Sequence, residues 1–200
     1  EKAFEQIEVL VNLNPDSAFK LLEGIEYPEI LDEPLYYKHV LLTVQAKDKS
    51  QRDITKDTLI REAADFFVQV GDEQHAASAR FYSGRIFLLG EDYKKAINEY
   101  LVAEELAQKV ENDYLLALIN YDIGVIYRRQ LNYEKCLKHY YISKDYFSRI
   151  NNKKQENNVL NQIGNVYLRM DPPQLEKAFS FYNQALEYAT QEKDTMQVYV

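Results

Sequence analysis

The chain has 200 residues, a formal net charge of −8, a hydrophobic content of 46% and one cysteine. A core can therefore form, but the acidic balance disfavours sequence-independent binding to nucleic acid or anionic lipid, which requires clustered Lys and Arg. One cysteine forms no internal disulfide, and no apolar stretch approaches the roughly eighteen residues that a membrane helix needs.

The first 71 residues are predicted to form divergent helices. Apolar residues recur at helical spacing from Phe4 to Leu13 and from Ala18 to Ile25. Between these stretches, Asn14 is suited to an N-cap and Pro15 to a first helical position. Two further helices are predicted over 35–47 and 54–70.

From residue 73 onwards the chain repeats itself. Glycines stand at 84, 124 and 164, at intervals of 40 residues, and each is followed three positions later by an aromatic residue. A second motif then alternates small and aromatic residues in a fixed order. Small residues permit close approach of two helices, and rings fill the space beside them. The small-aromatic-small sets are Ala96, Tyr100 and Ala103, then Cys136, Tyr140 and Ser143, then Ala178, Tyr182 and Ala185.

Short polar breaks set the helix boundaries of these repeats. Asp and Asn at the breaks are suited to N-caps, and Gly71 and Gly90 to left-handed residues after helix ends. We expect one domain over 1–200, with repeats at about 73–110, 113–150 and 153–192, and a truncated helix at 194–200. The repeat helices are predicted over 73–89, 92–110, 113–130, 133–150, 153–170 and 174–192.

Glycine followed three residues later by Phe or Tyr, and then a small residue followed four residues later by Tyr, resembles the tetratricopeptide repeat, whose period is about 34 residues. The resemblance implies an all-α fold, a right-handed superhelical solenoid of antiparallel helix pairs. Each unit here is longer by more than a turn. Pro172 and Pro173 are expected in the inter-helix turn of the third unit, where two extra residues lie.

Several stretches also resemble the tetratricopeptide lipoproteins and regulators of Bacteroidetes-type bacteria. That resemblance implies a scaffold or sensor, with an export signal in front and a membrane or regulatory segment behind, located at the cell envelope or periplasm; a cytoplasmic location is the alternative. The Asn and Lys carboxylate clamp of chaperone-binding repeat proteins is not reproduced as a set. The stretches are Pro15–Ala18, Leu41–Thr43, Asp53–Thr55 and Tyr82–Arg85.

No constellation of residues predicts catalysis. His39, His75 and His139 are far apart, and none has the His or Cys spacing of a metal site. Cys136 occupies the small-residue position of Ala96, which indicates a packing role. We therefore expect no enzyme activity, no metal and no cofactor.

Stacked helix pairs leave a curved inner surface that suits an extended peptide or a partner helix. In the repeat register, the positions three before and one after each glycine face this surface, together with residues one turn further on. The mixture is aromatic, cationic and amide-bearing. The predicted binding residues are Phe81, Arg85, Tyr121, Val125, Arg128, Asn161, Asn165 and Arg169.

The predicted function is therefore binding of a protein or peptide. The alternative is the regulatory part of a transcription regulator whose DNA-binding segment lies outside this chain. The chain starts at Glu1 and stops at Val200 within an expected helix, so we expect an excised piece. We expect this fragment to bind no nucleic acid and to insert into no membrane, and an apolar flank at its end predicts a homodimer.

Overall fold

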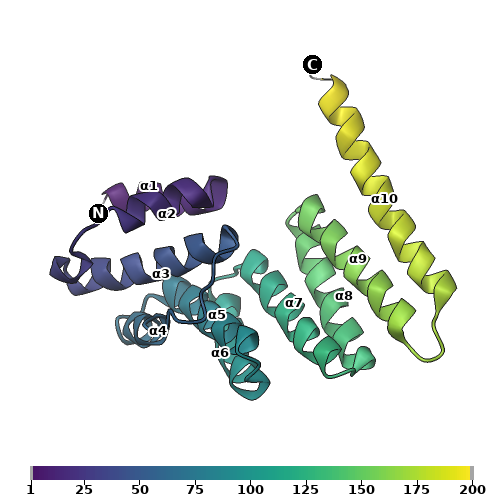
Figure 1. Cartoon of the computed structure of the whole chain (residues 1–200), viewed down its shortest axis with the longest axis horizontal. Coiled ribbons are helices and arrows are strands. Elements are labelled where there is room, and N and C mark those ends of the chain that lie inside the picture. Colours follow the sequence, from purple (N-terminus) through teal and green to yellow (C-terminus); the bar gives the residue numbers. More distant parts are fainter. Residues whose placement is uncertain (1, 199–200) are drawn as a thin grey trace. The chain divides into compact units, whose positions relative to one another are not determined.

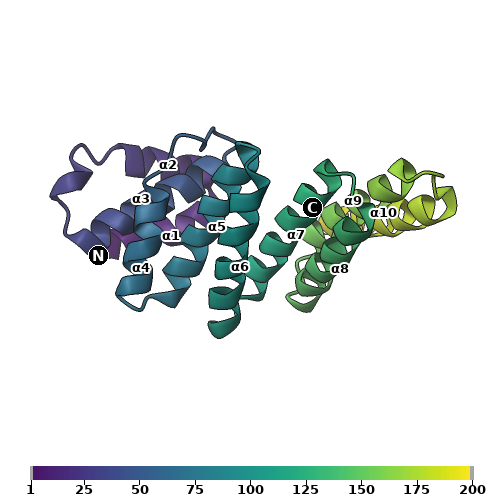
Figure 2. The ribbon, with the colours of Figure 1, turned by 90° about the horizontal axis from the view of Figure 1, so that it is seen from below.

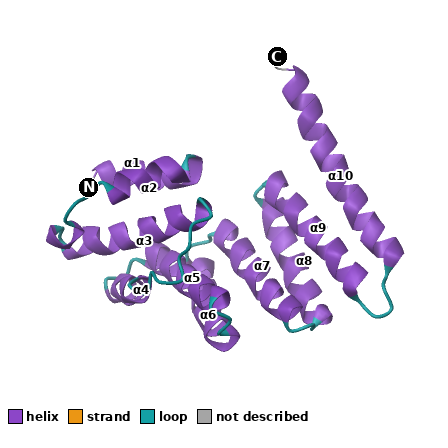
Figure 3. Ribbon diagram, in the orientation of Figure 1, coloured by secondary structure: helices purple, strands orange, loops and turns teal. Residues whose placement is uncertain are grey.

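The computed structural model describes residues 2–198, and within that range it contains helices and no strand (Figure 3). The all-α prediction is confirmed, because consecutive helices pack against each other in pairs. The chain divides into two compact units, Glu1–Glu111 and Asn112–Val200, and each is described by itself. The expectation of one continuous domain, and the superhelical sense, stay predictions.

Within residues 2–111, the first unit contains six α-helices and one short 3-10 helix (Figure 1). Helix α3 packs against α1, α2, α4 and α5, so it lies at the centre of this unit. Seen from below, α4, α5 and α6 lie side by side (Figure 2). The elements are α1 (Lys2–Leu13), α2 (Pro15–Glu23), η1 (Pro28–Ile30), α3 (Glu33–Lys49), α4 (Ile60–Gln69), α5 (Glu73–Leu89) and α6 (Tyr93–Lys109).

The second unit is a run of four α-helices. Its core is a cluster of buried residues contributed by all four, including Ala117, Tyr140, Ile163 and Ala178. The helices are α7 (Asp113–Arg129), α8 (Tyr133–Arg149), α9 (Lys153–Arg169) and α10 (Leu175–Val198).

The same turn joins each helix to the next from α4 to α9. A residue with positive φ is followed by an Asp or Asn, whose side chain accepts a hydrogen bond from the backbone N–H three residues later. Both features satisfy backbone groups that helix ends leave unpaired. The predicted caps are confirmed: Asp72, Asp92, Asn112, Asn132 and Asn152.

The prediction for Gly71 is right and that for Gly90 is wrong. Gly71 has a φ of 77°, whereas Gly90 has a φ of −79° and Glu91, the next residue, takes the left-handed conformation at 61°. The left-handed residue stands directly before the N-cap in every one of these turns, so the position of Asp92 places it at Glu91.

The predicted helix over 54–70 is also shorter than expected. Residues 51–59 form a loop, because Asp53 accepts a hydrogen bond from the Thr55 N–H (2.8 Å) and Asp57 pairs with Lys47 of α3 (2.7 Å). Ile54 is fully buried and fixes the loop on the unit.

The last helix is longer than expected. Helix α10 continues unbroken to Val198, because no Gly, Pro or capping motif interrupts it, so no separate helix begins at 194. Residues 199 and 200 lie outside the described part.

Candidate functional site

Six of the predicted binding residues lie on α7 and α9, the first helices of the two pairs in the second unit. Positions 121 and 161, and 125 and 165, are equivalent in the 40-residue period, so these residues share a register. We call this set the α7–α9 face: Tyr121, Val125, Arg128, Asn161, Asn165 and Arg169.

The α7 part of the face is half-buried. The Tyr121 ring stacks on the Tyr140 ring with centroids 5.4 Å apart, and Val125 packs against the same core cluster. Both side chains are therefore held in place while part of each remains accessible. Fixed, partly exposed apolar groups of this kind lose little entropy when a partner covers them.

Arg128 is the most unusual member of the face. Its Nε is buried and forms no hydrogen bond of normal geometry among the described residues. The guanidinium nevertheless lies near the Tyr140 hydroxyl: burial raises the pKa of Tyr140, and Arg128 acts in the opposite direction through its charge and a side-chain hydrogen bond. Burial raises the pKa of Cys136 to about 12, although the charge of nearby Arg128 acts in the opposite direction. The thiol therefore stays protonated and does not neutralise the positive charge of Arg128.

The two asparagine side chains on α9 form different kinds of hydrogen bond. Asn161 donates from Nδ2 to the Asn157 carbonyl (3.2 Å), a bond within its own helix. Asn165 accepts a hydrogen bond from the Tyr182 hydroxyl of α10 (2.8 Å), so it also fixes the packing of the pair. Arg169, near the end of the helix, is exposed.

The two predicted residues of the first unit do not form a comparable face. Phe81 is 1% exposed and packs against Tyr82 and Tyr100, so it is a core residue and offers no surface to a partner. Arg85 is half-buried and pairs with Asp48 of α3 (3.0 Å). Its charge is already used to join α5 to α3.

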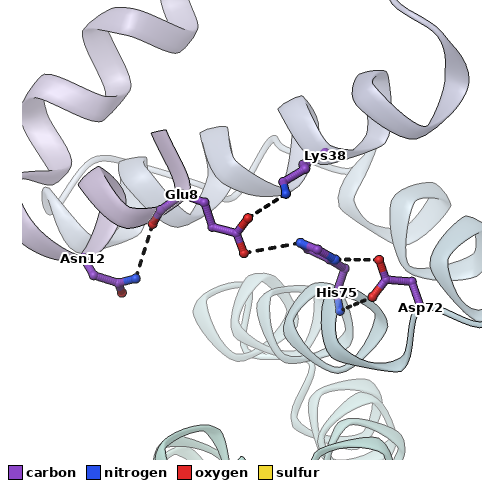
Figure 4. A network of polar contacts seen from close by, with 5 residues as sticks. All are labelled: Glu8, Asn12, Lys38, Asp72 and His75. Carbon is purple, nitrogen blue, oxygen red and sulfur yellow. Dashed lines mark hydrogen bonds and ion pairs between the residues drawn. The ribbon is translucent and has the colours of Figure 1, made fainter. Parts of the chain in front are cut away.

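A polar network that sequence reasoning missed lies in the first unit (Figure 4). The Nδ1 of His75 is 2.6 Å from Asp72, its Nε2 is 3.4 Å from Glu8 of α1, and Glu8 also pairs with Lys38 of α3 (2.6 Å). Burial lowers the pKa of His75, but hydrogen bonds to the two carboxylates outweigh burial and raise it. In the sequence, the position of Asp72 three residues before His75 was the feature that could have indicated this network.

His139 is a packing residue of α8. Its Nδ1 lies 3.0 Å from the Asn120 side-chain oxygen and its ring stacks on Tyr127. Burial lowers its pKa, which favours the neutral ring.

The acidic residues are unevenly distributed. Residues 1–111 hold 13 Lys and Arg against 22 Asp and Glu, a formal charge of −9, whereas residues 112–200 hold 11 against 10, a formal charge of +1. The α7–α9 face, with two arginines and no carboxylate, therefore belongs to the unit that does not repel an acidic partner.

No group of three or more His, Cys, Asp and Glu side chains in residues 2–198 could hold a metal ion. Within that same range, each helix is too short or too polar to span a bilayer.

No family model matches the chain, and no curated protein matches its sequence. Several solved structures match in fold, among them the following three. BtubC (BKLC) from P. vanneervenii has a TM-score of 0.72 at 17% identity, over 94% of this chain and 80% of BtubC. The apo form of RapI has a TM-score of 0.71 at 15% identity, over 96% of this chain and 70% of RapI.

The third structure is a signal transduction ATPase with numerous domains from Pyrococcus horikoshii, which carries a tetratricopeptide repeat sensor. The TM-score is 0.69 at 18% identity over 94% of this chain, and the chain spans 29% of that protein. Identities this low establish the fold alone. The chain is thus a helical repeat protein with a tetratricopeptide-like fold.

Proposed function

We propose that this chain is a non-enzymatic protein-binding module and that the α7–α9 face is where an acidic peptide or protein segment docks. The observation that carries the proposal is Arg128, a partly exposed cation that no described carboxylate neutralises, beside the half-exposed Tyr121 and Val125. A partner carboxylate would pair with the guanidinium, and the two flanking side chains would supply apolar contact. The formal charge of +1 on this unit supports an acidic partner.

The proposed role as a sensor or scaffold rests on the similarity in fold to a known sensor region. The ATPase from Pyrococcus horikoshii uses a tetratricopeptide repeat region as its sensor, which supports a sensor or scaffold role here. Placement at the cell envelope, and membership of the Bacteroidetes-type group, are parts of the same proposal. The regulatory part of a transcription regulator is the alternative.

The test is a selection of peptides with the intact chain, followed by calorimetry on the best acidic peptide. We expect Arg128→Glu to weaken binding by about 1–3 kcal/mol, the usual effect of truncating a central arginine contact. Arg149→Glu is the matched control, because Arg149 is exposed on α8, pairs with Asp113 at the start of α7 (3.3 Å) and is not a member of the α7–α9 face.

Asn161→Ala is a cleaner second variant than Asn165→Ala. The former loses a bond within one helix, whereas the latter leaves the Tyr182 hydroxyl without its acceptor. Equal affinity of wild type and Arg128→Glu, with Arg149→Glu weakened, would remove the α7–α9 face as the docking surface.

A further inference from the structure

A cavity of about 240 Å³ opens in the first unit, where the loop 51–59 lies against α5. Its lining includes Thr55 and Thr58 of the loop, Ile60 and Arg61 of α4, and Ser83 and Phe87 of α5. All of these residues belong to one compact unit. The cavity is therefore separate from the α7–α9 face.

The cavity exists because the first repeat departs from the other two at one position. Ser83 stands where the next repeats have Ile123 and Ile163, and all three positions are buried, with exposures of 1%, 3% and 0%. A serine fills much less space than an isoleucine, so the core is left open beside it. In the second and third repeats, the isoleucine side chain fills the space that is open beside Ser83.

The serine also brings a polar group into that space. The Ser83 hydroxyl is buried and has no hydrogen-bond partner among the described residues. Leaving a buried hydroxyl unpaired is unfavourable, and isoleucine would avoid that cost. An unpaired hydroxyl in a position that otherwise carries isoleucine favours a ligand that fills the space and meets the hydroxyl.

The lining defines the chemistry of such a ligand. Ile60, Ile86 and Phe87 form apolar walls, with the hydroxyls of Thr55 and Thr58 beside them. Walls of this kind accept an aliphatic or aromatic group.

The lining carries one cation, Arg61, and one carboxylate, Asp92, which is neutralised by Lys95. The Arg61 guanidinium lies 5.7 Å from the centre of the Phe87 ring, and no described carboxylate pairs with it. Lys95 lies over the same ring at 5.4 Å, but its charge is matched by Asp92 at 2.6 Å. Within a unit of formal charge −9, Arg61 is a local site for an anion.

We propose that this cavity binds a small organic acid, in which a carboxylate held by Arg61 is joined to an apolar body that fills the space beside Ser83. A body of about ten non-hydrogen atoms suits the volume, and a ligand of that size is expected to bind with a dissociation constant of about 0.1–1 mM. A peptide ending in an apolar residue offers the same chemistry, so the experiment must separate the two sources.

The experiment is a titration of the whole chain, followed by NMR, with 3-phenylpropionate, its amide and acetyl-Gly-Gly-Phe. We expect the acid to bind at least about tenfold more tightly than the amide, because the amide lacks the charge that Arg61 recognises. Tighter binding of the free acid than of the peptide assigns the cavity to a small molecule; the reverse order assigns it to a chain end.

Three variants locate the site. Ser83→Ile should abolish binding of the acid by filling the cavity, whereas Ser83→Ala, which leaves the space open, should keep it. Arg61→Gln, an exposed position that should not disturb folding, should remove the difference between acid and amide. If the acid and amide bind wild type equally, or if Ser83→Ile folds and binds the acid like wild type, the proposal is overturned.

Discussion

Glycine and tyrosine meet where the two helices of each repeat cross. A Cβ added to Gly124 would lie 2.5 Å from the Tyr140 ring, and the same construction gives 2.5 Å from Gly84 to Tyr100 and 2.7 Å from Gly164 to Tyr182. Real Cβ atoms do not approach other atoms this closely. The sequence prediction that these glycines permit close helix contact agrees with this geometry.

We therefore expect Gly124→Ala to lower the free energy of unfolding. Overpacking a core costs about 1–3 kcal/mol, of which the better helix propensity of alanine returns up to about 1. A net loss of about 1–2 kcal/mol should be measurable by urea unfolding followed by circular dichroism.

Gly90→Ala is the matched control for this measurement. Its φ of −79° is open to alanine, and the nearest atom to an added Cβ is the Ile86 carbonyl oxygen at 3.4 Å. We expect a change within about 0.5 kcal/mol. A Gly124→Ala protein as stable as the Gly90→Ala protein would show that the crossing is looser than described.

The left-handed residue of each turn could not be assigned from residue type alone. Only Gly71 among the five turns from α4 to α9 is a glycine; the others are Glu91, Glu111, Leu131 and Asn151. The register of the Asp and Asn caps fixes these positions, whereas the usual preference for glycine pointed to Gly90.

Leu131→Gly should stabilise the protein. Leu131 has a φ of 59° and is 71% exposed, so its side chain contributes little packing while its backbone is strained by about 1–2 kcal/mol. Glycine removes the strain and loses part of that gain to greater freedom in the unfolded state, for a net gain of about 0.5–1 kcal/mol.

Leu101→Gly, an exposed position inside α6, should instead destabilise by about 1 kcal/mol. Thermal unfolding of both variants checks the pair. A lower melting temperature for Leu131→Gly would contradict the account of the turn.

At the scale of elements, the regular helices were predictable and the exceptions were not. Six repeat helices begin within one residue of their predicted starts, because Asp and Asn caps and helical periodicity agree. The loop 51–59 was missed because its fixation depends on contacts between distant residues, such as Lys47 with Asp57, that no local pattern contains.

Helix α1 is held to the first unit partly by ionised groups, so its docking should depend on pH. The pKa of His75 is raised above its usual 6.5, so its stabilising effect is complete below pH 6.5 and is lost as the pH rises through the folded value. The pKa of Glu8 is lowered from 4.5 to about 2, chiefly by its hydrogen bond to His75, so its effect is lost as the pH falls from 4.5 towards 2.

The contribution of the pair should therefore be largest between about pH 4.5 and 6.5. We expect the melting temperature of wild type to exceed that of His75→Gln most clearly at pH 5.5 and by much less at pH 9. Hydrogen exchange of residues 2–13 should follow the same trend. A difference that is independent of pH would mean that His75 stabilises this unit by packing on Phe67 alone.

At the scale of the whole molecule, the repeat architecture followed from the 40-residue period, but the binding residues followed only in part. Residues at one register position differ in environment: Phe81 is buried against Tyr100, whereas the equivalent Tyr121 remains half-exposed. Arg85 and Asn165 likewise proved to be partners of Asp48 and Tyr182. The position of a residue in the repeat predicts which helix face it lies on. The packing of neighbouring side chains then determines whether it is accessible to a partner.

The cavity beside Ser83 shows the opposite case. Its signal was present in the sequence as the one departure from Ile at positions 83, 123 and 163. The loop that covers it, however, belongs to the divergent part of the chain, where no repeat register applies. The substitution of Ser for Ile could therefore be interpreted as a cavity only once the loop that lies against it was known.

The most direct test of the proposed docking surface is photocrosslinking of the selected acidic peptide to the intact chain. A photoreactive p-benzoylphenylalanine placed at Val125, on the α7–α9 face, should capture the peptide. The same group at Asp145, an exposed residue of α8, should not. Capture at position 145 with none at position 125, in proteins that bind the peptide with wild-type affinity, would contradict the assignment of binding to the α7–α9 face.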